Sequence, residues 1–167
     1  MKWCIGEEPG DAARDGSEPP KGAHALSLGA RFFGKYEHSL DAKGRLILPA
    51  KLRVHFDRPG FLTPHFEGCL ALWRVEEFDA EIEIRLAEAG GDARTRNSVR
   101  DWSANVFEVE IDRQGRMAIP AELREYAQLQ QEVLVTGMIN RVELWSPQVF
   151  ATKNDAVVDE PASLRGH

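Results

Sequence analysis

The order of hydrophobic and polar positions repeats along the chain, which predicts a duplicated β-rich unit. Residues 35–48 contain two short alternating or aromatic-rich runs, typical of strands, on either side of a polar turn. Pro49 follows, and it suits the first turn of a helix because proline lacks the N–H that a central strand needs. Residues 106–120 repeat this course. Each copy therefore predicts two strands and then a short helix, over 49–56 and 120–129.

A second strand pair follows in each copy. The stretch FLTPHFEGCLALW at 61–73 aligns with VLVTGMINRVELW at 133–145, and both end on a tryptophan that we expect in the core. Turns are expected near residues 65–68 and 137–140. Such self-similarity predicts a fold built from two equivalent halves. One half alone would have exposed sheet edges and too little core, so we expect a pseudo-symmetric pair with shared strands.

The segment between the copies has a helical pattern instead. Glutamates fill one face, and apolar residues recur at helical spacing on the other, at Val75, Phe78, Ile82, Leu86 and Ala89. Gly90 and Gly91 end that helix, and Asp92 can cap a second one that runs to residue 104. The expected organisation is a disordered N-terminal tail (1–31), a first module (32–80), a helical linker (81–103), a second module (104–150) and a flexible C-terminal tail (151–167).

A thirteen-residue stretch occurs twice in similar form, as DAKGRLILPAKLR at 41–53 and DRQGRMAIPAELR at 112–124. Asp in the first position and Gly in the fourth indicate a type I turn that closes a hairpin, with the carboxylate capping N–H groups and the glycine taking positive φ. The turn does not need the arginine that follows, Arg45 or Arg116. An ion pair with the turn aspartate is one explanation, and contact with phosphate or the guanine O6/N7 edge is the other. We favour DNA contact at Arg45 and leave both explanations open at Arg116.

Charge is distributed unevenly, which narrows the choice of partner. The net charge of −6 argues against a protein that binds nucleic acids non-specifically. Residues 31–74 nevertheless carry eight Lys or Arg against four Asp or Glu, whereas residues 75–104 carry four against eight. Cations of the basic segment can position a duplex through its phosphates. The candidate DNA contacts are Arg45, Lys43, Arg116, Lys35, Lys51 and Arg53, with an ion pair as an equal alternative for Arg53 and its counterpart Arg124.

Neither catalysis nor metal binding is expected. Two distant cysteines without a CxxC pair indicate a reducing cytoplasm, and no zinc-type ligand set emerges among the cysteines and histidines. His38, Ser39 and Asp41 lie within four residues, where strand alternation points neighbours to opposite faces, so a triad is disfavoured. No apolar run is long enough to span a membrane. We therefore expect no enzyme, cofactor, small-molecule substrate or membrane association.

The two motif regions, YEHSLDAKGRLILPAKLR and VEIDRQGRMAIPAELREYAQL with its ELW ending, resemble the two halves of the MraZ family of bacterial transcriptional regulators. The resemblance covers residues 32–150. It implies a β-rich α+β fold of two AbrB-like swapped-hairpin modules. It also implies rings of eight or more chains that bind direct-repeat, G-rich promoter boxes of the division and cell-wall gene cluster and usually repress it. The motif arginine tied to DNA contact falls on Arg45 and Arg116.

We therefore expect a sequence-specific regulator of transcription in the cytoplasm, associated with the nucleoid, whose partners are double-stranded promoter DNA and copies of itself. Three alternatives stay open: an antitoxin-like regulator of the same fold, an oligomeric protein scaffold without DNA binding, and a small hydrolase that uses Asp41 and His38. Gln114 and Glu122 replace Lys43 and Lys51 of the first copy. Equal DNA binding by the two copies is therefore in question.

Overall fold

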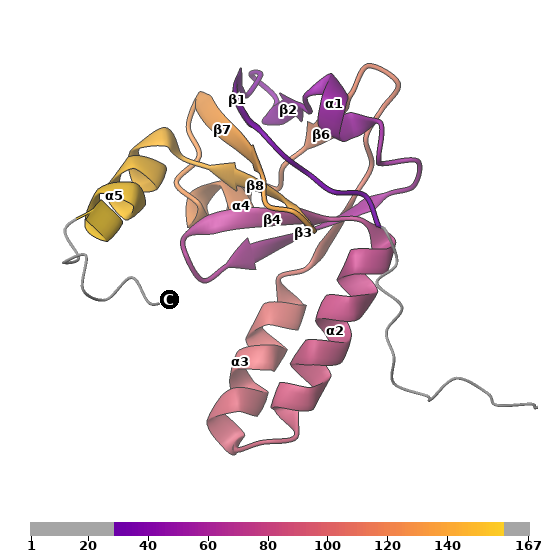
Figure 1. Cartoon of the computed structure of the whole chain (residues 1–167), viewed down its shortest axis with the longest axis vertical. Helices are drawn as coiled ribbons and strands as arrows, with labels where there is room; N and C mark the ends of the chain where they lie inside the picture. Colours follow the sequence, from indigo (N-terminus) through magenta and orange to yellow (C-terminus); the bar gives the residue numbers. More distant parts are fainter. Residues whose placement is uncertain (1–28, 159–167) are drawn as a thin grey trace, which may run out of the picture.

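The computed structural model describes residues 29–158 of the 167-residue chain (Figure 1), so the predicted N-terminal tail lies outside the described residues except for its last three positions. Within this range the strands are β1 (Lys35–Ser39), β2 (Arg45–Ile47), β3 (Gly60–His65), β4 (Cys69–Trp73), β5 (Phe107–Val109), β6 (Arg116–Ala118), β7 (Glu132–Gly137) and β8 (Val142–Trp145). The helices are α1 (Ala50–Arg53), α2 (Val75–Ala89), α3 (Ala93–Ala104), α4 (Ala121–Tyr126) and α5 (Pro147–Val158).

The two halves of the chain exchange strands within one six-stranded sheet. Its order is β1-β7-β8-β4-β3-β5. Strand β1 of the first half pairs antiparallel with β7 of the second, and β5 of the second half pairs with β3 of the first. The hairpins β3–β4 and β7–β8 meet at the centre, where β4 pairs with β8. The predicted α+β fold of two repeated, pseudo-symmetric modules with a helical connection is confirmed.

The first two strands of each half do not form the hairpin that the residue pattern predicts. Strand β2 pairs instead with β6 in a separate two-stranded ribbon, with Leu46 opposite Met117. Within a half, one bridge joins Leu40 to Leu46, and its equivalent joins Ile111 to Met117. Burial explains the difference. The exchanged pairing puts Leu46 and Met117 in the shared core, where both are fully buried.

One hydrophobic core fills the space between this ribbon and the sheet. The ribbon and its two short helices contribute Leu46, Leu48, Leu52, Met117, Ile119 and Leu123. The sheet contributes Leu62, Leu70, Leu72, Val133, Val135, Val142 and Leu144. Burying a side chain of this size stabilises the fold by about 1.5–3 kcal/mol. Trp73 and Trp145 are buried as predicted, on the other face of the sheet.

Helices α2 and α3 lie side by side and project away from the sheet (Figure 1). They are anchored at their base, where the Phe78 ring stacks on Phe61 with centroids 4.3 Å apart. Asp92 caps α3 as predicted, because its carboxylate accepts from the N–H of Thr95 at 2.8 Å. Leu86, expected on a buried face, is 65% exposed. The outer turns of the pair extend beyond the sheet and have no core to cover.

The C-terminal segment begins as a helix rather than as the predicted flexible tail. Helix α5 runs to Val158, which corrects that prediction for residues 151–158, while residues 159–167 lie outside the described range. Pro147 occupies the first helical position, which its fixed φ favours. The Phe150 ring packs edge-on against Trp145 with centroids 5.5 Å apart, and this contact holds the helix on the sheet. None of the helices in the described part is long and apolar enough to cross a membrane.

Replacing Leu46 by alanine should destabilise both halves together. The change leaves a cavity in the shared core, and such truncations cost about 2–5 kcal/mol of unfolding free energy. Because the halves exchange strands, we expect one cooperative unfolding transition, with its midpoint at a lower urea concentration than in the wild type. Tryptophan fluorescence measures this transition. Half-exposed Ile47 on the same strand offers a control, since Ile47→Ala should change stability by no more than about 0.5 kcal/mol. Two separate transitions would contradict the interleaved fold.

Candidate nucleic-acid interface

The first D-x-x-G-R motif forms a closed turn that leads into β2. The N–H of Gly44 donates to the carbonyl of Asp41 at 3.0 Å, and the N–H of Asp41 donates to the carbonyl of Arg45 at 2.9 Å. One carboxylate oxygen of Asp41 accepts from the N–H groups of Lys43 and Arg45, both at 2.9 Å. Gly44 has a φ of +73°, which a residue with a Cβ would resist. The predicted turn-capping role of the aspartate is confirmed.

The same carboxylate also holds the arginine side chain. Arg45 Nε donates to the second oxygen of Asp41 at 2.7 Å, so the ion pair within the motif is present. Among the described residues, the two terminal amino groups of Arg45 have no hydrogen-bond partner, and the side chain is 32% exposed. An exposed ion pair contributes only about 0–1 kcal/mol of stability. Its main effect is therefore to fix the direction of the guanidinium group.

The second motif repeats this geometry. The N–H of Gly115 donates to the carbonyl of Asp112 at 2.8 Å. The carboxylate of Asp112 accepts from the N–H groups of Gln114 and Arg116 at 2.8 and 2.9 Å, and from Arg116 Nε at 2.8 Å. The Arg116 side chain is also 32% exposed. The two arginines are therefore held in equivalent ways.

Pairing of β2 with β6 brings both arginines onto one surface. Leu46 and Met117 point into the core, so their neighbours Arg45 and Arg116 point outward on the opposite face of the ribbon. Arg45 lies opposite Ala118 in the register. The two arginines are consequently diagonal neighbours, with backbones about 7–8 Å apart. Because the strands are antiparallel, the two turns lie at opposite ends of this face.

Each turn is braced by an arginine from the other half. Arg53 of α1 donates from Nη1 to the carbonyl of Gln114 at 2.9 Å and covers Gly115 so closely that a Cβ there would collide with its guanidinium group. Arg124 of α4 donates from Nε to the carbonyl of Ile119 at 3.1 Å, and a Cβ on Gly44 would lie 2.7 Å from Arg124 Cζ. Arg53, a predicted DNA contact, is thus engaged in supporting the second turn, and neither arginine forms the alternative ion pair among the described residues.

Both turn aspartates remain charged at neutral pH. The pKa of the Asp41 carboxyl lies below its usual value chiefly because the backbone N–H of Arg45 donates to it. The backbone N–H of Arg116 lowers the pKa of the Asp112 carboxyl in the same way, followed by the Arg116 side chain. Each carboxylate therefore offsets the charge of its own arginine, and other cations must supply the net positive charge of the turns.

One such cation stands in each turn, although the sequence repeat hides the second. Lys43 is exposed in the first turn, as predicted, while Gln114 occupies its place in the second. Arg113, one position earlier, is exposed in the second turn and restores the charge. A comparison of the two motifs position by position missed Arg113. Comparing the whole turn rather than single positions would have found it.

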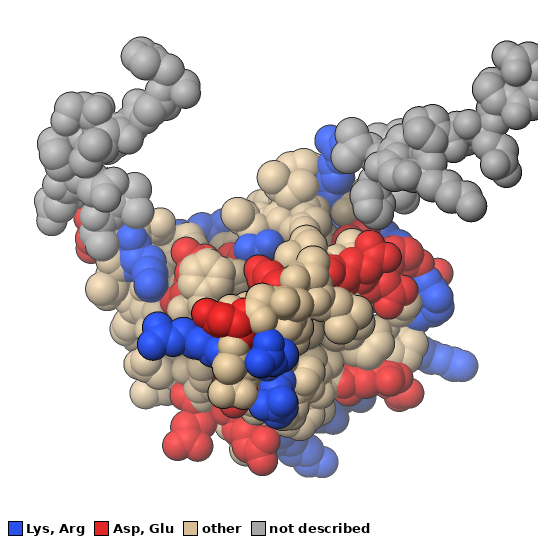
Figure 2. Space-filling model, turned by 90° about the horizontal axis from the view of Figure 1, so that it is seen from below, with Lys and Arg blue, Asp and Glu red and all other residues tan. Residues whose placement is uncertain are grey.

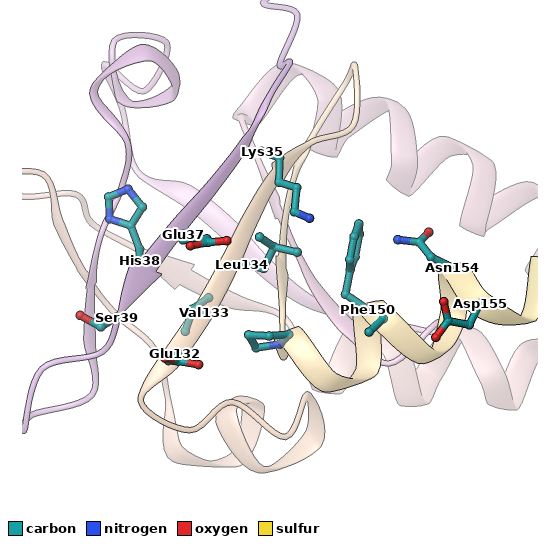
Figure 3. Close-up of a pocket in the computed structure, with 12 residues that line it drawn as sticks. Lys35, Glu37, His38, Ser39, Glu132, Val133, Leu134, Phe150, Asn154 and Asp155 are labelled. Carbon is teal, nitrogen blue, oxygen red and sulfur yellow. The ribbon is translucent and has the colours of Figure 1, made fainter.

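The remaining predicted contacts separate into two groups. Lys51 is exposed on α1, and its counterpart on α4 is the exposed Glu122. Lys35 lies elsewhere. Its ammonium group sits over the Phe150 ring, 5.1 Å from the centroid, in a cavity of about 530 Å³ between β1, β7 and α5 (Figure 3). The structure therefore brings Arg45 and Arg116 to one face, places Lys43 in the turn next to Arg45 and leaves Lys35 out.

Away from the ribbon, charges of both signs are mixed. Viewed from the free end of the α2–α3 pair, Asp and Glu alternate with Lys and Arg over the surface (Figure 2). Ion pairs along α2 account for part of this pattern, such as Arg85 with Glu81 at 2.8 Å and Arg74 with Glu76 at 2.9 Å. This end of the molecule has the character of an ordinary solvated surface.

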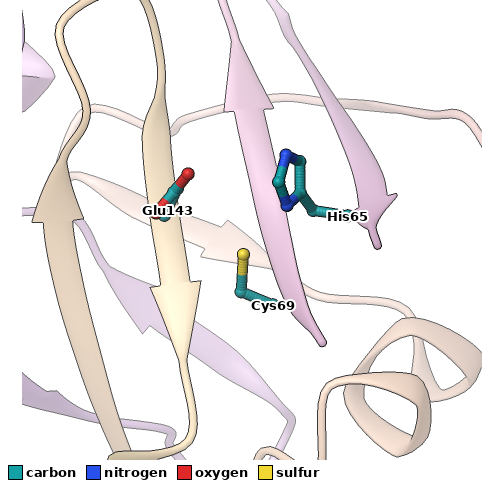
Figure 4. A group of neighbouring side chains, drawn as sticks. All are labelled: His65, Cys69 and Glu143. Carbon is teal, nitrogen blue, oxygen red and sulfur yellow. The ribbon is translucent and has the colours of Figure 1, made fainter. Parts of the chain in front are cut away.

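Folding also creates a cluster that sequence spacing did not suggest. Ligand-type atoms of His65, Cys69 and Glu143 lie within 4.8 Å of one another (Figure 4). Both carboxylate oxygens of Glu143 are already engaged, one by Arg141 at 2.8 Å and the other by Trp145 Nε1 at 3.0 Å. Burial raises the pKa of the Cys69 thiol and lowers the pKa of His65. A buried ion pair and its tryptophan donor therefore account for the Glu143 carboxylate in this cluster.

The hydrolase alternative finds no support in the geometry. His38 and Ser39 are neighbours on β1, and no hydrogen bond joins either of them to Asp41 in the part of the chain that the structure describes. Asp41 instead uses both carboxylate oxygens within its own turn. It therefore cannot orient a histidine without dismantling that turn.

The fold and this surface together define a strand-rich α+β protein of two repeated modules interleaved in one chain. Residues 32–98 and 104–163 match the family described as "MraZ protein, putative antitoxin-like". The transcriptional regulator MraZ of Acetivibrio thermocellus is 42% identical over 115 residues, which cover 68% of this chain and 80% of that protein. That of Thermomicrobium roseum is 38% identical over 135 residues, covering 80% and 94%. The chain belongs to the MraZ family, a family of transcriptional regulators and not of enzymes.

The arginine–aspartate contacts should survive mild acid and fail in strong acid. A depressed carboxyl pKa means that the contact is intact above the unfolded value of about 3.9 and is lost as pH falls through the lower folded value. In ¹⁵N spectra, the Nε–H signals of Arg45 and Arg116 should therefore persist at pH 4 and vanish only below it. Asp41→Asn should shift the Arg45 signal alone, with Arg116 as the internal control. Loss of both signals near pH 6 would contradict these contacts.

Removing a brace should loosen the turn of the opposite half. Arg53→Ala deletes the bond to the Gln114 carbonyl, so we expect faster hydrogen exchange at the amides of Gln114 and Arg116 and little change at Lys43 and Arg45. Arg124→Ala removes only packing against Gly44 of the first turn, because its hydrogen bond goes to Ile119 of its own half, so exchange at Lys43 and Arg45 should rise by a smaller factor. A variant that affects the turn of its own half more than the other would show that the bracing is not crossed.

Proposed function

We propose that the chain binds double-stranded DNA in a sequence-specific manner through the outward face of the β2–β6 ribbon and regulates transcription by doing so. One observation carries the proposal: Arg45 and Arg116 are diagonal neighbours on this face, each is tethered through Nε to its turn aspartate, and each side chain is 32% exposed. A two-stranded ribbon is narrow enough to enter the major groove of B-DNA.

The tether suits an arginine that reads a base. A guanidinium group can donate two parallel hydrogen bonds to O6 and N7 of guanine, and the terminal amino groups of Arg45 are available for this. Holding the side chain in advance lowers the entropy lost on binding. The neighbouring cations Lys43, Arg113 and Lys51 are exposed and fit phosphate contacts, which position the duplex without reading its sequence.

A single chain offers few contacts to DNA, so the proposal includes an assembly of several chains. Four or five cations give weak binding that falls steeply with salt. Several copies on direct-repeat boxes would raise the overall affinity by about 10²–10⁴ through linkage alone. We therefore propose a ring-shaped homo-oligomer, associated with the nucleoid, that binds direct-repeat promoter boxes of the division and cell-wall gene cluster and represses it. Relatives named transcriptional regulator MraZ support the regulatory role.

Fluorescence anisotropy on the DNA upstream of the chain's own gene tests the proposal. Arg45→Ala should raise Kd by about 5- to 150-fold, since a guanine-paired arginine contributes about 1–3 kcal/mol. Arg116→Ala should cause a smaller loss, because Gln114 and Glu122 replace two lysines around it. Arg45→Lys should not restore binding, since lysine lacks the planar fork. Lys43→Ala should lower the slope of log K against log salt by about 0.9.

Lys35→Ala is the matched control, because Lys35 is an exposed cation of the same half that lies away from the ribbon. Its affinity and salt slope should equal those of the wild type. Unchanged binding by both arginine variants would remove the DNA-binding assignment and favour a protein scaffold of the same fold.

A further inference from the structure

An exposed apolar knob stands at the tip of the β7–β8 hairpin. It consists of Ile139, which is 58% exposed, together with Met138 and Phe33, both also exposed. The knob is firmly held: Ile139 and Phe32 exchange two backbone hydrogen bonds of 2.8 and 3.0 Å, and the N–H of Met138 donates to the carbonyl of Arg141 at 2.8 Å. Neighbouring apolar side chains on a rigid tip are typical of a contact surface.

The backbone at Ile139 makes this exposure more informative. Ile139 has a φ of +61°, a left-handed conformation that costs an L-residue about 1–2 kcal/mol and that β-branched residues rarely adopt. The corresponding hairpin of the first half takes positive φ at a glycine instead, Gly68 at +89°. Neither backbone preference nor core packing explains an isoleucine here. A strained residue that points its apolar side chain into solvent indicates a function outside the folded chain.

A groove of matching character lies at the tip of the β3–β4 hairpin. Its cavity measures about 240 Å³ and lies between that tip and helices α3 and α4, with Pro64, Phe66, Trp102, Leu123 and Tyr126 on its apolar walls. Phe66 is 83% exposed. The Tyr126 hydroxyl donates to the carbonyl of His65 at 2.8 Å and so fixes α4 against the tip. The groove is therefore preformed and large enough for an aliphatic side chain.

Knob and groove lie at opposite ends of the sheet. Strands β4 and β8 pair antiparallel, with Leu70 opposite Leu144 and Leu72 opposite Val142, so the hairpin tips that precede β4 and β8 point in opposite directions. One molecule cannot bring its own knob to its own groove. Two different patches at opposite ends fit a head-to-tail contact between copies, the type of contact that generates rings.

Charge favours the same partner. Asp101, Glu122 and Arg85 line the groove beside its apolar walls, and Arg85 is paired with Glu81 of α2 at 2.8 Å, which leaves the two acids to set the charge of the groove. Arg31, two positions before Phe33, is exposed next to the knob. Opposite charges at the rims of two apolar patches favour this pairing and its orientation.

We propose that a second copy of this chain inserts its Ile139 knob into the groove formed by Phe66, α3 and α4, and that repetition of this contact builds the oligomer. The inference deepens the proposed function, since it rests on the assembly that direct-repeat binding requires. It is tested separately from DNA binding, because the two residues to be substituted, Ile139 and Phe66, lie outside β2 and β6.

Light scattering on the full-length chain with two variants tests the contact. Ile139→Gly removes the knob, and its backbone accepts positive φ, so the melting temperature should be unchanged or higher while the mass falls to that of one chain, 18.7 kDa. Phe66→Asp should have the same effect on mass from the groove side. An equimolar mixture of the two variants keeps one intact knob and one intact groove, and should form dimers. Leu86→Ala, at an exposed aliphatic residue of α2, should keep the wild-type mass.

Several results would overturn the proposal: a wild-type chain that is monomeric, an Ile139→Gly chain that stays assembled, a mixture that stays monomeric, or a Phe66→Asp chain that stays assembled, as a knob-to-knob contact would predict. Binding to DNA with one box separates this failure from failure of the proposed function. Ile139→Gly should retain the single-box affinity of the wild type, since its ribbon is intact. Loss of assembly together with retained single-box binding supports both proposals, and assembly without any dependence of DNA binding on Arg45 overturns only the DNA assignment.

Discussion

Pairing of β2 with β6 across the two halves is the constraint on which the rest of the structure depends. The ribbon is closed at each end by a turn glycine: the N–H of Leu48 donates to the carbonyl of Gly115 at 2.8 Å, and the N–H of Ile119 donates to that of Gly44 at 3.0 Å. This pairing buries Leu46 and Met117, places both motif arginines on one face, and positions α1 and α4 to brace the opposite turns. Neither half contains a complete core or a complete surface of its own.

The structural and functional explanations of the motif arginine are not alternatives. The contact between Asp41 and Arg45 is exposed, so its contribution to stability is small. It occupies Nε and leaves the terminal amino groups free to meet another molecule. The aspartate thus performs two tasks at once, since one oxygen closes the turn through backbone N–H groups and the other orients the guanidinium. A lysine in this place could not do both, because its single ammonium group on a flexible stem lacks the separate Nε and terminal donors of a planar guanidinium.

Local chemistry could be predicted from the sequence, whereas pairing between distant segments could not. The turns follow from Asp41 and Gly44, and the cap of α3 follows from Asp92, because each depends on residues within four positions. The residue pattern at Leu46 is the same whether β2 pairs with β1 or with β6, so only the shared core decides between them. In the sequence, Lys35 cannot be distinguished from the other cations of the basic segment. Only the fold shows that its ammonium group lies over the Phe150 ring. The helical start of α5 likewise depends on a surface at Trp145 that a linear reading does not show.

The crossed braces have a consequence for how the two copies can change over time. Arg53 hydrogen-bonds to the turn of the second half, and Arg124 packs against Gly44 in the turn of the first, so a substitution on either helix affects the turn of the other copy. The two repeats therefore cannot accumulate substitutions independently, as two separate genes could after a duplication. Lys51 against Glu122 shows how far the copies differ at an exposed position, and a specialised second copy must evolve within a frame that the first copy supplies.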